Sequence, residues 1–213
     1  MLLRMAHLPR TESRMTISEQ KAVARKRFKA YRSSLTAPEY ERYSNQICDR
    51  LERLRAWTAG EIVHVFWPII ERREPDIRPF IRRLFEMDVG LVMPIVVSFS
   101  VDRADGARLR HAKVDSLDYF KLNKWGIAEP KSQIFVSVNE LDVVIVPALG
   151  ADRNGHRIGY GMGYYDEFLS NVDIPIICPI FSGCLVDEIA HEGHDVAVSM
   201  IVTERATVDI NVT

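Results

Sequence analysis

The residues best suited to chemistry lie in the stretch RIGYGMGYYD, from Arg157 to Asp166, where glycine takes every second position between Gly159 and Gly163. Glycines let the backbone approach an anion closely, and free N–H groups at a helix N-terminus can then face that anion. An arginine before such a loop can add a charge-assisted contact, and a carboxylate after it can hold a magnesium ion that bridges phosphates. The pattern therefore predicts a phosphate-binding loop, while alternating glycines that only form tight turns remain the alternative.

The segments on either side of this loop are expected to position it. Val143 to Val146 is a short apolar run of β-branched residues before Pro147, which is typical of a buried strand in an α/β sheet. Tyr164 to Leu169 is predicted to begin a helix. The loop is neither a Walker A loop, which needs Gly-Lys-Ser/Thr, nor the GxGxxG dinucleotide motif. Strand, glycine-rich loop and helix start together still favour a phosphate site.

The ten residues from Arg157 to Asp166 resemble the motif of the 5-formyltetrahydrofolate cyclo-ligase family, also called 5,10-methenyltetrahydrofolate synthetase, which is usually written R-L-G-x-G-x-G-Y-Y-D. Ile158 is the one departure within the motif. The family's preceding strand ends V-P-G-L-A-F-D, whereas this chain has V-P-A-L-G-A-D. The resemblance rests on five separated motifs in the same order and covers roughly residues 18–205.

Two basic residues on the first predicted helix form the next match. Thr16 to Glu19 has the form of a capping box, so a helix is expected to run to about Leu35. Lys21 and Arg25 lie four positions apart and share one helix face, which by itself indicates a solvated basic surface. The resemblance implies instead that both reach the phosphates of ATP. It assigns the rest of the ATP site to Arg157, Ile158, Gly159, Tyr160, Gly161, Met162, Gly163, Tyr164 and Tyr165.

A second group of residues resembles the family's folate pocket. Ile62 to Phe66 is predicted as a strand, and the resemblance implies that Trp67 after it lines the pteridine pocket. Glu74 falls in an E-x-D-x-R-P variant of a family motif and would hydrogen-bond the pterin, because a carboxylate suits paired N–H donors. The gap between these two residues is longer than usual by two, so Glu71 remains the alternative. The segment 125–130 resembles an aromatic-G-I-x-E-P motif and is expected to form a wall of the cleft, with Trp125 as a weaker candidate for ligand contact.

Carboxylates near the C-terminus complete the resemblance. His194-Asp195 matches a family motif, which implies that Asp195 and Asp166 lie near a Mg²⁺ ion. The neighbouring His191 and Glu192 could suggest a zinc site with His194. Three ligands so close on one loop are geometrically awkward and lack the HExxH spacing, so the sequence disfavours zinc.

The remaining pattern predicts the fold class. A capping box at Thr36–Glu39 precedes an amphipathic helix, and Pro79 is expected to open another helix that runs to about Met87. Further buried strands are predicted at 91–95 and 174–181. Alternating strands and helices indicate a three-layer α/β/α fold with a mostly parallel open sheet. The resemblance implies the architecture shared by sugar-phosphate isomerases and CoA-transferases. We expect one domain over residues 16–213 after an N-terminal extension over residues 1–15.

Composition narrows the possible partners. The 213 residues carry a net charge of −1, which gives no reason to expect nucleic acid or an anionic membrane surface. No segment approaches the ~18 consecutive apolar residues of a membrane helix. The three cysteines lack paired spacing and are predicted to be buried thiols in a reducing compartment. We expect a monomer in the cytoplasm.

The resemblance implies a reaction. The family cyclises 5-formyltetrahydrofolate to 5,10-methenyltetrahydrofolate with ATP and Mg²⁺, releasing ADP and phosphate through a phosphorylated formyl group. Arg157, Tyr164 and Lys21 would be catalytic, and Trp67, Glu74 and Tyr164 would bind the folate. Two alternatives stay open: a paralogue that binds folate or nucleotide without catalysis, and an isomerase or CoA-transferase that shares the architecture.

Overall fold

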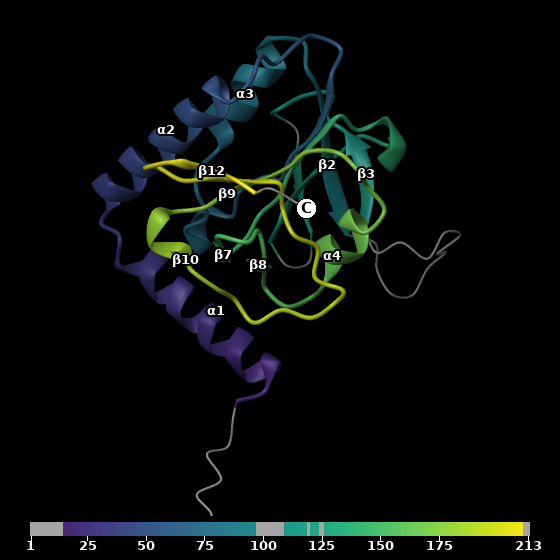
Figure 1. Ribbon diagram of the computed structural model, residues 1–213. Coiled ribbons are helices and arrows are strands. Elements are labelled where there is room, and N and C mark those ends of the chain that lie inside the picture. Colours follow the sequence, from purple (N-terminus) through teal and green to yellow (C-terminus); the bar gives the residue numbers. More distant parts are fainter. Residues whose placement is uncertain (1–14, 97–108, 119, 124–125, 211–213) are drawn as a thin grey trace, which may run out of the picture.

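The computed structural model describes residues 15–96, 109–118, 120–123 and 126–210 (Figure 1). Within these ranges the chain has a mixed α/β fold around a large, mostly parallel sheet, as the alternation of predicted elements indicates. The expected N-terminal extension, apart from Met15, lies outside the described residues, and so does Trp125.

The first two helices begin at the predicted capping boxes. Helix α1 (Ile17–Ser34) starts after Thr16, whose side chain accepts from the backbone of Glu19 while the glutamate caps Thr16 in return. Thr36 and Glu39 form the same reciprocal pair at the start of α2 (Ala37–Arg53). These pairs satisfy N–H groups that have no partner inside the helix, which fixes where each helix begins. The third predicted helix is present as α3 (Arg78–Glu86).

Seven strands form the main sheet, in the order β12-β11-β9-β6-β1-β2-β3. The five inner strands run parallel, while the edge strands β3 and β12 run antiparallel to their neighbours. The strands are β1 (Ile62–His64), β2 (Gly90–Val96), β3 (Leu109–Lys113), β6 (Val143–Ile145), β9 (Ile176–Pro179), β11 (Met200–Val202) and β12 (Thr207–Asp209). The mostly parallel open sheet is therefore confirmed.

The strand order creates a crevice between β1 and β6. From β1 the chain continues to β2 on one side, whereas from β6 it continues to β9 on the other side. Connections that leave in opposite directions open a space beyond the carboxyl ends of the two strands, and ligands of open α/β sheets bind at such points. Trp67 follows β1 and Pro147 follows β6, so both predicted site segments start at this crevice.

Both faces of the sheet are buried. Val63 and Val143 point into the cluster that holds residues of α2 and α3, whereas Val92 and Val144 point into a second cluster with Phe168. Phe168 belongs to α4 (Tyr164–Leu169), which covers the second face together with the loops around it (Figure 1). Strands buried on both sides read as continuous apolar runs, which is why Val143–Val146 carries no polar alternation.

Two small sheets lie beside the main one and were not predicted. The first has the order β10-β7-β8, with β7 (Gly150–Asp152), β8 (Arg157–Ile158) and β10 (Leu185–Val186). Its β7–β8 hairpin places the glycine-rich loop at the end of β8. The second pairs β4 (Phe120–Leu122) with β5 (Ala128–Pro130). Three short 3₁₀ turns complete the fold, η1 (Ile70–Arg72), η2 (Val138–Glu140) and η3 (Ser182–Cys184).

The departures from the family's V-P-G-L-A-F-D wording lie in the core beneath α1. A Cβ on Gly150 would come within 2.6 Å of the Phe28 ring and 2.5 Å of the Cys184 carbonyl oxygen. Ala148 and Ala151 are buried, and the carbonyl oxygen of Ala148 accepts from the buried Arg32 side chain. The small residues therefore leave room for Phe28 and for close packing of α1.

The cysteines are as predicted: Cys48, Cys178 and Cys184 are buried free thiols. Burial raises the pKa of Cys48 and Cys178 to about 12, so both stay protonated near neutral pH. Among the described residues, none of the helices has the length and apolar character needed to cross a membrane.

Candidate active site

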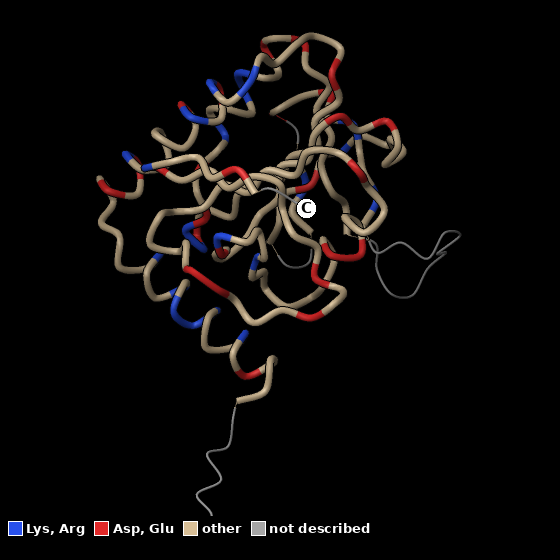
Figure 2. The backbone as a smooth tube through the Cα atoms, viewed as in Figure 1, with Lys and Arg blue, Asp and Glu red and all other residues tan. Residues whose placement is uncertain are grey.

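A cavity of about 410 Å³ opens at the carboxyl ends of β1, β2 and β6. Its walls come from α1, from the segments after β1 and β6, from β2 and from the glycine-rich loop. The volume is in the range of small-molecule sites. Figure 2 shows positively charged residues along α1, the helix that borders this loop. The cavity therefore lies where the strand order predicts a ligand site.

The glycine-rich loop, residues 159–163, forms one side of the cavity. Gly161 and Gly163 have φ of 96° and 68°, which favours glycine at both positions. A Cβ on Gly161 would also come within 3.3 Å of the Arg25 guanidinium. Gly163 occupies the N-cap of α4 in its left-handed conformation, so the chain turns sharply from the loop into the helix.

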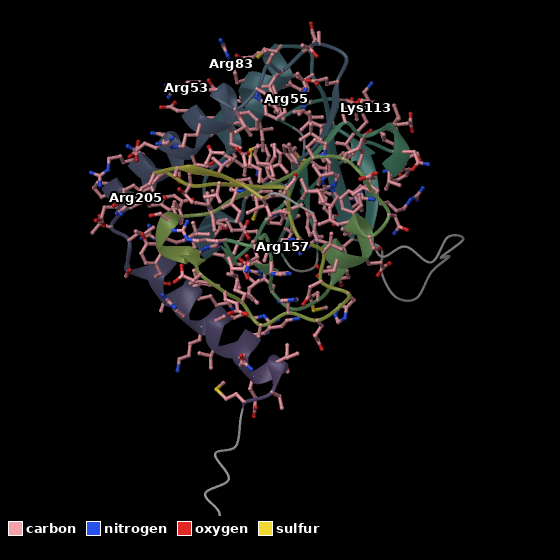
Figure 3. All side chains as sticks on the ribbon, in the orientation of Figure 1. Arg53, Arg55, Arg83, Lys113, Arg157 and Arg205 are labelled. Carbon is pink, nitrogen blue, oxygen red and sulfur yellow. The ribbon has the colours of Figure 1, made fainter. Side chains whose placement is uncertain are left out.

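Arg157 and Asp166 form an ion pair across the loop. Arg157 Nη1 donates to Asp166 Oδ1 at 2.7 Å, and Arg157 is only 8% exposed. Arg157 Nη2 is buried without a hydrogen-bond partner among the described residues. A buried donor without a partner costs about 1–3 kcal/mol, so an anion at this nitrogen would be stabilised. Figure 3 shows Arg157 inside the molecule, whereas the labelled Arg53, Arg83 and Arg205 lie at the periphery of this view.

The two basic residues of α1 reach the same loop. Arg25 Nε donates to the carbonyl oxygen of Gly159 at 3.1 Å, and both Lys21 and Arg25 line the cavity. Lys21 Nζ lies 2.6 Å from Asp195 Oδ2 and 3.0 Å from Glu192 Oε2. The structure thus brings together basic residues that are more than a hundred positions away from the loop in sequence.

The Lys21–Asp195 pair shifts the pKa of both groups. Burial lowers the pKa of Lys21, but the hydrogen bonds to Asp195 and Glu192 outweigh it and raise the pKa above its usual value. For Asp195, burial raises the pKa, yet the hydrogen bonds from Lys21 and the Glu192 amide produce a net lowering. Lys21 therefore stays cationic at neutral pH beside the cavity.

The two carboxylates expected near magnesium have different surroundings. Asp166 lines the cavity, while Asp195 is bound to Lys21 and is not part of the cavity wall. The described residues include no cluster of three or more His, Cys, Asp or Glu side chains placed to hold a metal. Mg²⁺ is commonly held by one or two carboxylates together with substrate phosphates. Of the two carboxylates, Asp166 in the cavity wall would fit such a role, whereas Asp195 is bonded to Lys21.

Glu74 lies in the cavity wall and Glu71 does not. Glu74 is 3% exposed, its Oε1 accepts from the Tyr160 hydroxyl at 2.9 Å, and its Oε2 accepts from the Ile69 amide at 2.8 Å. Glu71 is exposed on η1. Burial raises the pKa of Glu74, while the Ile69 amide and the positive charge of Arg32 oppose that rise. Of the two glutamates left open by the sequence, the geometry favours Glu74.

Aromatic and apolar side chains also line the cavity. Trp67 packs on Phe120, with ring centroids 4.5 Å apart. Trp67 and Ile127, which belongs to the 125–130 segment, both line the cavity. Glu129 of the same segment accepts from the Val96 amide at 3.0 Å and from Asn123 at 2.9 Å. The bond from Val96 joins the segment to β2. The wall can therefore stack a flat ring system beside Trp67.

The sequence did not identify several residues of the cavity. Arg72 lines it and places its guanidinium carbon 4.9 Å from the Tyr160 ring centroid. Met93 and Pro94 contribute from β2. Pro94 lies near the end of β2, which is next to β1 at the crevice, so its position in the sequence could have indicated a cavity residue. Arg72 lies in a 3₁₀ turn whose direction no local pattern reveals.

Comparison with known proteins gives a consistent result. The model of the 5-formyltetrahydrofolate cyclo-ligase family matches residues 17–204. A 5-formyltetrahydrofolate cyclo-ligase of Mycolicibacterium smegmatis is 36% identical over 86 residues, which cover 38% of this chain and 44% of that protein. The Escherichia coli K12 protein of the same name is 26% identical over 142 residues, 66% of this chain and 74% of that protein. The match to the mycobacterial relative thus spans less than half of its length.

A solved structure supports the fold. The NMR structure of Aquifex aeolicus 5,10-methenyltetrahydrofolate synthetase superimposes with a TM-score of 0.75 and covers 91% of this chain and 94% of its own. Its sequence identity is 23%, so this likeness concerns the architecture.

Proposed function

Because the chain belongs to the 5-formyltetrahydrofolate cyclo-ligase family, we propose that it converts 5-formyltetrahydrofolate and ATP to 5,10-methenyltetrahydrofolate, ADP and phosphate. The proposal rests on one observation: residues suited to phosphate and residues suited to a pterin line the same cavity. Its wall includes the glycine-rich loop with three cationic side chains beside it, and also Glu74 and Trp67. A phosphate donor and a pterin would therefore meet within one site.

The chemistry explains why both halves are needed. The oxygen of a formamide is a poor leaving group, so the γ-phosphoryl group of ATP is first transferred to it. The carbon then carries a phosphate leaving group in an iminium phosphate. N10 of the folate attacks this carbon, the C–O bond breaks, and phosphate leaves as the five-membered ring closes. N10 loses its proton to solvent or phosphate, so the mechanism needs no protein base.

Phosphoryl transfer depends on placement and charge neutralisation more than on covalent help. In the proposed mechanism Lys21, Arg25 and Arg157 neutralise the phosphates, and the backbone N–H groups of residues 159–163 hold them. Tyr164 orients the formyl group or the phosphate with its hydroxyl. Asp166 would hold Mg²⁺ together with the phosphates, and the ion would neutralise charge that develops during transfer. Asp195 would take part as a second carboxylate only when Lys21 turns toward the nucleotide.

Glu74 and Trp67 give the folate its orientation. Two carboxylate oxygens can accept two parallel N–H donors of a pterin edge. Trp67 offers a flat apolar face beside them. We also propose that the enzyme acts as a monomer in the cytoplasm, a reducing compartment that suits its free, unpaired cysteines.

The test is the near-ultraviolet absorbance of purified protein with 5-formyltetrahydrofolate and magnesium, with and without ATP. A rise that requires ATP would identify the methenyl product. Folate binding with ATP left intact would indicate a binding protein without catalysis. Activity that persists without ATP would favour an isomerase or transferase.

A further inference from the structure

Tyr160 connects the glycine-rich loop to Glu74 in the cavity wall. It lies in the glycine-rich loop, yet its hydroxyl donates to Glu74 Oε1 at 2.9 Å, across 86 positions of sequence. Burial, followed by the negative charge of Glu74, raises the pKa of Tyr160, so the hydroxyl remains a donor at neutral pH. The loop proposed to hold phosphate is thus bonded directly to the carboxylate proposed to hold the pterin.

The two hydrogen bonds of Glu74 fix the plane of its carboxylate and leave acceptor positions open on both oxygens. The Tyr160 hydroxyl occupies one oxygen and the Ile69 amide occupies the other. An ionised carboxylate has about four acceptor positions, so roughly one remains on each oxygen for a ligand. Two parallel donors of a pterin edge need both remaining positions to face them. The Tyr160 bond, together with that of the Ile69 amide, therefore sets the orientation in which Glu74 meets the ligand.

Arg25 holds the loop on both sides of Tyr160. Its Nε donates to the Gly159 carbonyl oxygen at 3.1 Å, and its guanidinium packs against Gly161. The guanidinium carbon of Arg72 and Nζ of Lys29 lie 4.9 and 5.7 Å from the centroid of the Tyr160 ring. An anion that engages Arg25 and the loop amides would order the backbone that carries Tyr160.

We propose that Tyr160 is a positioning residue that couples the phosphate-binding loop to the folate pocket, so that a bound nucleotide strengthens folate binding. The inference rests on the proposed function. Each ligand is proposed to contact one end of the Tyr160–Glu74 hydrogen bond, so a ligand that holds one of these two residues in place also favours the position in which the other meets its own ligand. By linkage, folate must strengthen nucleotide binding by the same factor.

The test measures the dissociation constant of 5-formyltetrahydrofolate with and without a non-hydrolysable ATP analogue and magnesium. In the wild type we expect the analogue to tighten folate binding at least about fivefold, the lower end of typical coupling factors. Tyr160→Phe removes the hydroxyl and keeps the aromatic ring near Arg72 and Lys29. Its coupling factor should approach one, while each ligand still binds with a measurable constant.

Tyr43→Phe is the matched control. Tyr43 lies on α2, its ring centroid 6.4 Å from that of Phe181, and it does not line the cavity. This variant should keep the wild-type coupling factor, and thermal unfolding should show that both variants are folded. Coupling that survives in Tyr160→Phe, or a wild-type factor of one, would overturn the inference.

The outcomes separate this inference from the proposed function. Formation of methenyl product without coupling would refute the role of Tyr160 alone. Coupled binding of both ligands without product would support Tyr160 and refute the proposed activity. Failure of the wild type to bind either ligand would overturn both.

Discussion

Arg157 and Asp166 are joined at 2.7 Å across the turn that residues 159–163 make between β8 and α4. The ion pair links the last strand before the loop to the helix after it, so the two ends of the loop are held together. One guanidinium nitrogen remains buried without a partner among the described residues. The arginine therefore both shapes the loop and offers a donor inside it.

The first prediction concerns this arginine. Arg157→Ala should lower the turnover number on the order of 10²–10³-fold, because a charge-stabilising donor of the transferred group is lost. Arg157→Lys should recover part of the rate, since it restores charge without the planar pair of donors. Steady-state kinetics with saturating ATP and folate would measure both. Near-normal turnover in Arg157→Ala would remove this residue from the mechanism.

The second prediction distinguishes the two glutamates. Glu74→Gln should weaken folate binding about tenfold or more, because hydrogen bonds to a charged acceptor contribute roughly 1.5–3 kcal/mol each. ATP binding in the absence of folate should change little, since the substitution leaves the cationic side chains of Lys21, Arg25 and Arg157 unaltered. Glu71→Gln is the control, as Glu71 is exposed and outside the cavity wall. If only the control variant lost folate affinity, the assignment of Glu74 would be wrong.

The third prediction concerns pH and two buried histidines. His64 and His111 lie with ring centroids 5.2 Å apart, and neither nitrogen of His64 has a hydrogen-bond partner among the described residues. Burial lowers the pKa of His111 from 6.5 to about 4, and burial followed by the charge of His111 lowers the pKa of His64 well below 6.5. Both are therefore neutral in the folded protein.

A lowered pKa in the folded state means that the unfolded chain binds more protons below pH 6.5. The stability that comes from the neutral form is complete above that pH and is lost as pH falls toward about 4. For His111 alone the loss should reach about 2 kcal/mol near pH 5.

Urea unfolding across this pH range would measure the effect. His111→Phe should flatten the pH dependence of the unfolding free energy. The exposed His194, changed to Gln, should leave that dependence as in the wild type. An unchanged slope in His111→Phe would show that other groups govern acid unfolding.

The fourth prediction concerns the packing of α1. Gly150→Ala should destabilise the fold by about 1–3 kcal/mol, because a new methyl group would collide with Phe28 and with the backbone of Cys184. Gly193→Ala is the control, since a Cβ there meets no atom within 4 Å. Thermal unfolding of both variants would compare them. Equal melting temperatures would mean that α1 shifts freely and does not constrain position 150.

The sequence predicted where the helices begin more accurately than where the strands end. The capping boxes at Thr16 and Thr36 predicted two helix starts, because a cap depends only on residues three positions apart. The strand at Val143 was found from its β-branched run. The strand that was expected at residues 62–66 ends at His64 in the sheet, although Val65 still donates to the Val92 carbonyl oxygen at 2.8 Å. Strand ends depend on partners that a single segment does not contain.

In the candidate site, too, the sequence indicated residues that lie close together in the chain but not the pairings between distant residues. The glycine-rich loop and its flanking Arg157 and Asp166 were recognised together because their chemistry lies within ten consecutive residues. Lys21 and Arg25 were suggested by resemblance, and the structure shows both beside the loop. Asp195 was expected beside a metal, and the structure shows it bound to Lys21. That pairing joins residues 174 positions apart, which no local spacing could reveal.

The sequence by itself determined the helix starts, the apolar strands, the glycine-rich loop and the types of charged group available for phosphate. These follow from short-range hydrogen bonding and from the periodicity of apolar residues, both of which are written in neighbouring positions. Only the tertiary structure placed Glu74 in the cavity wall and Glu71 outside it, bonded Tyr160 to Glu74 and left no room for a side chain at position 150. Those outcomes depend on how distant segments pack at the switch point of the sheet, where burial and shape select contacts that sequence spacing does not encode.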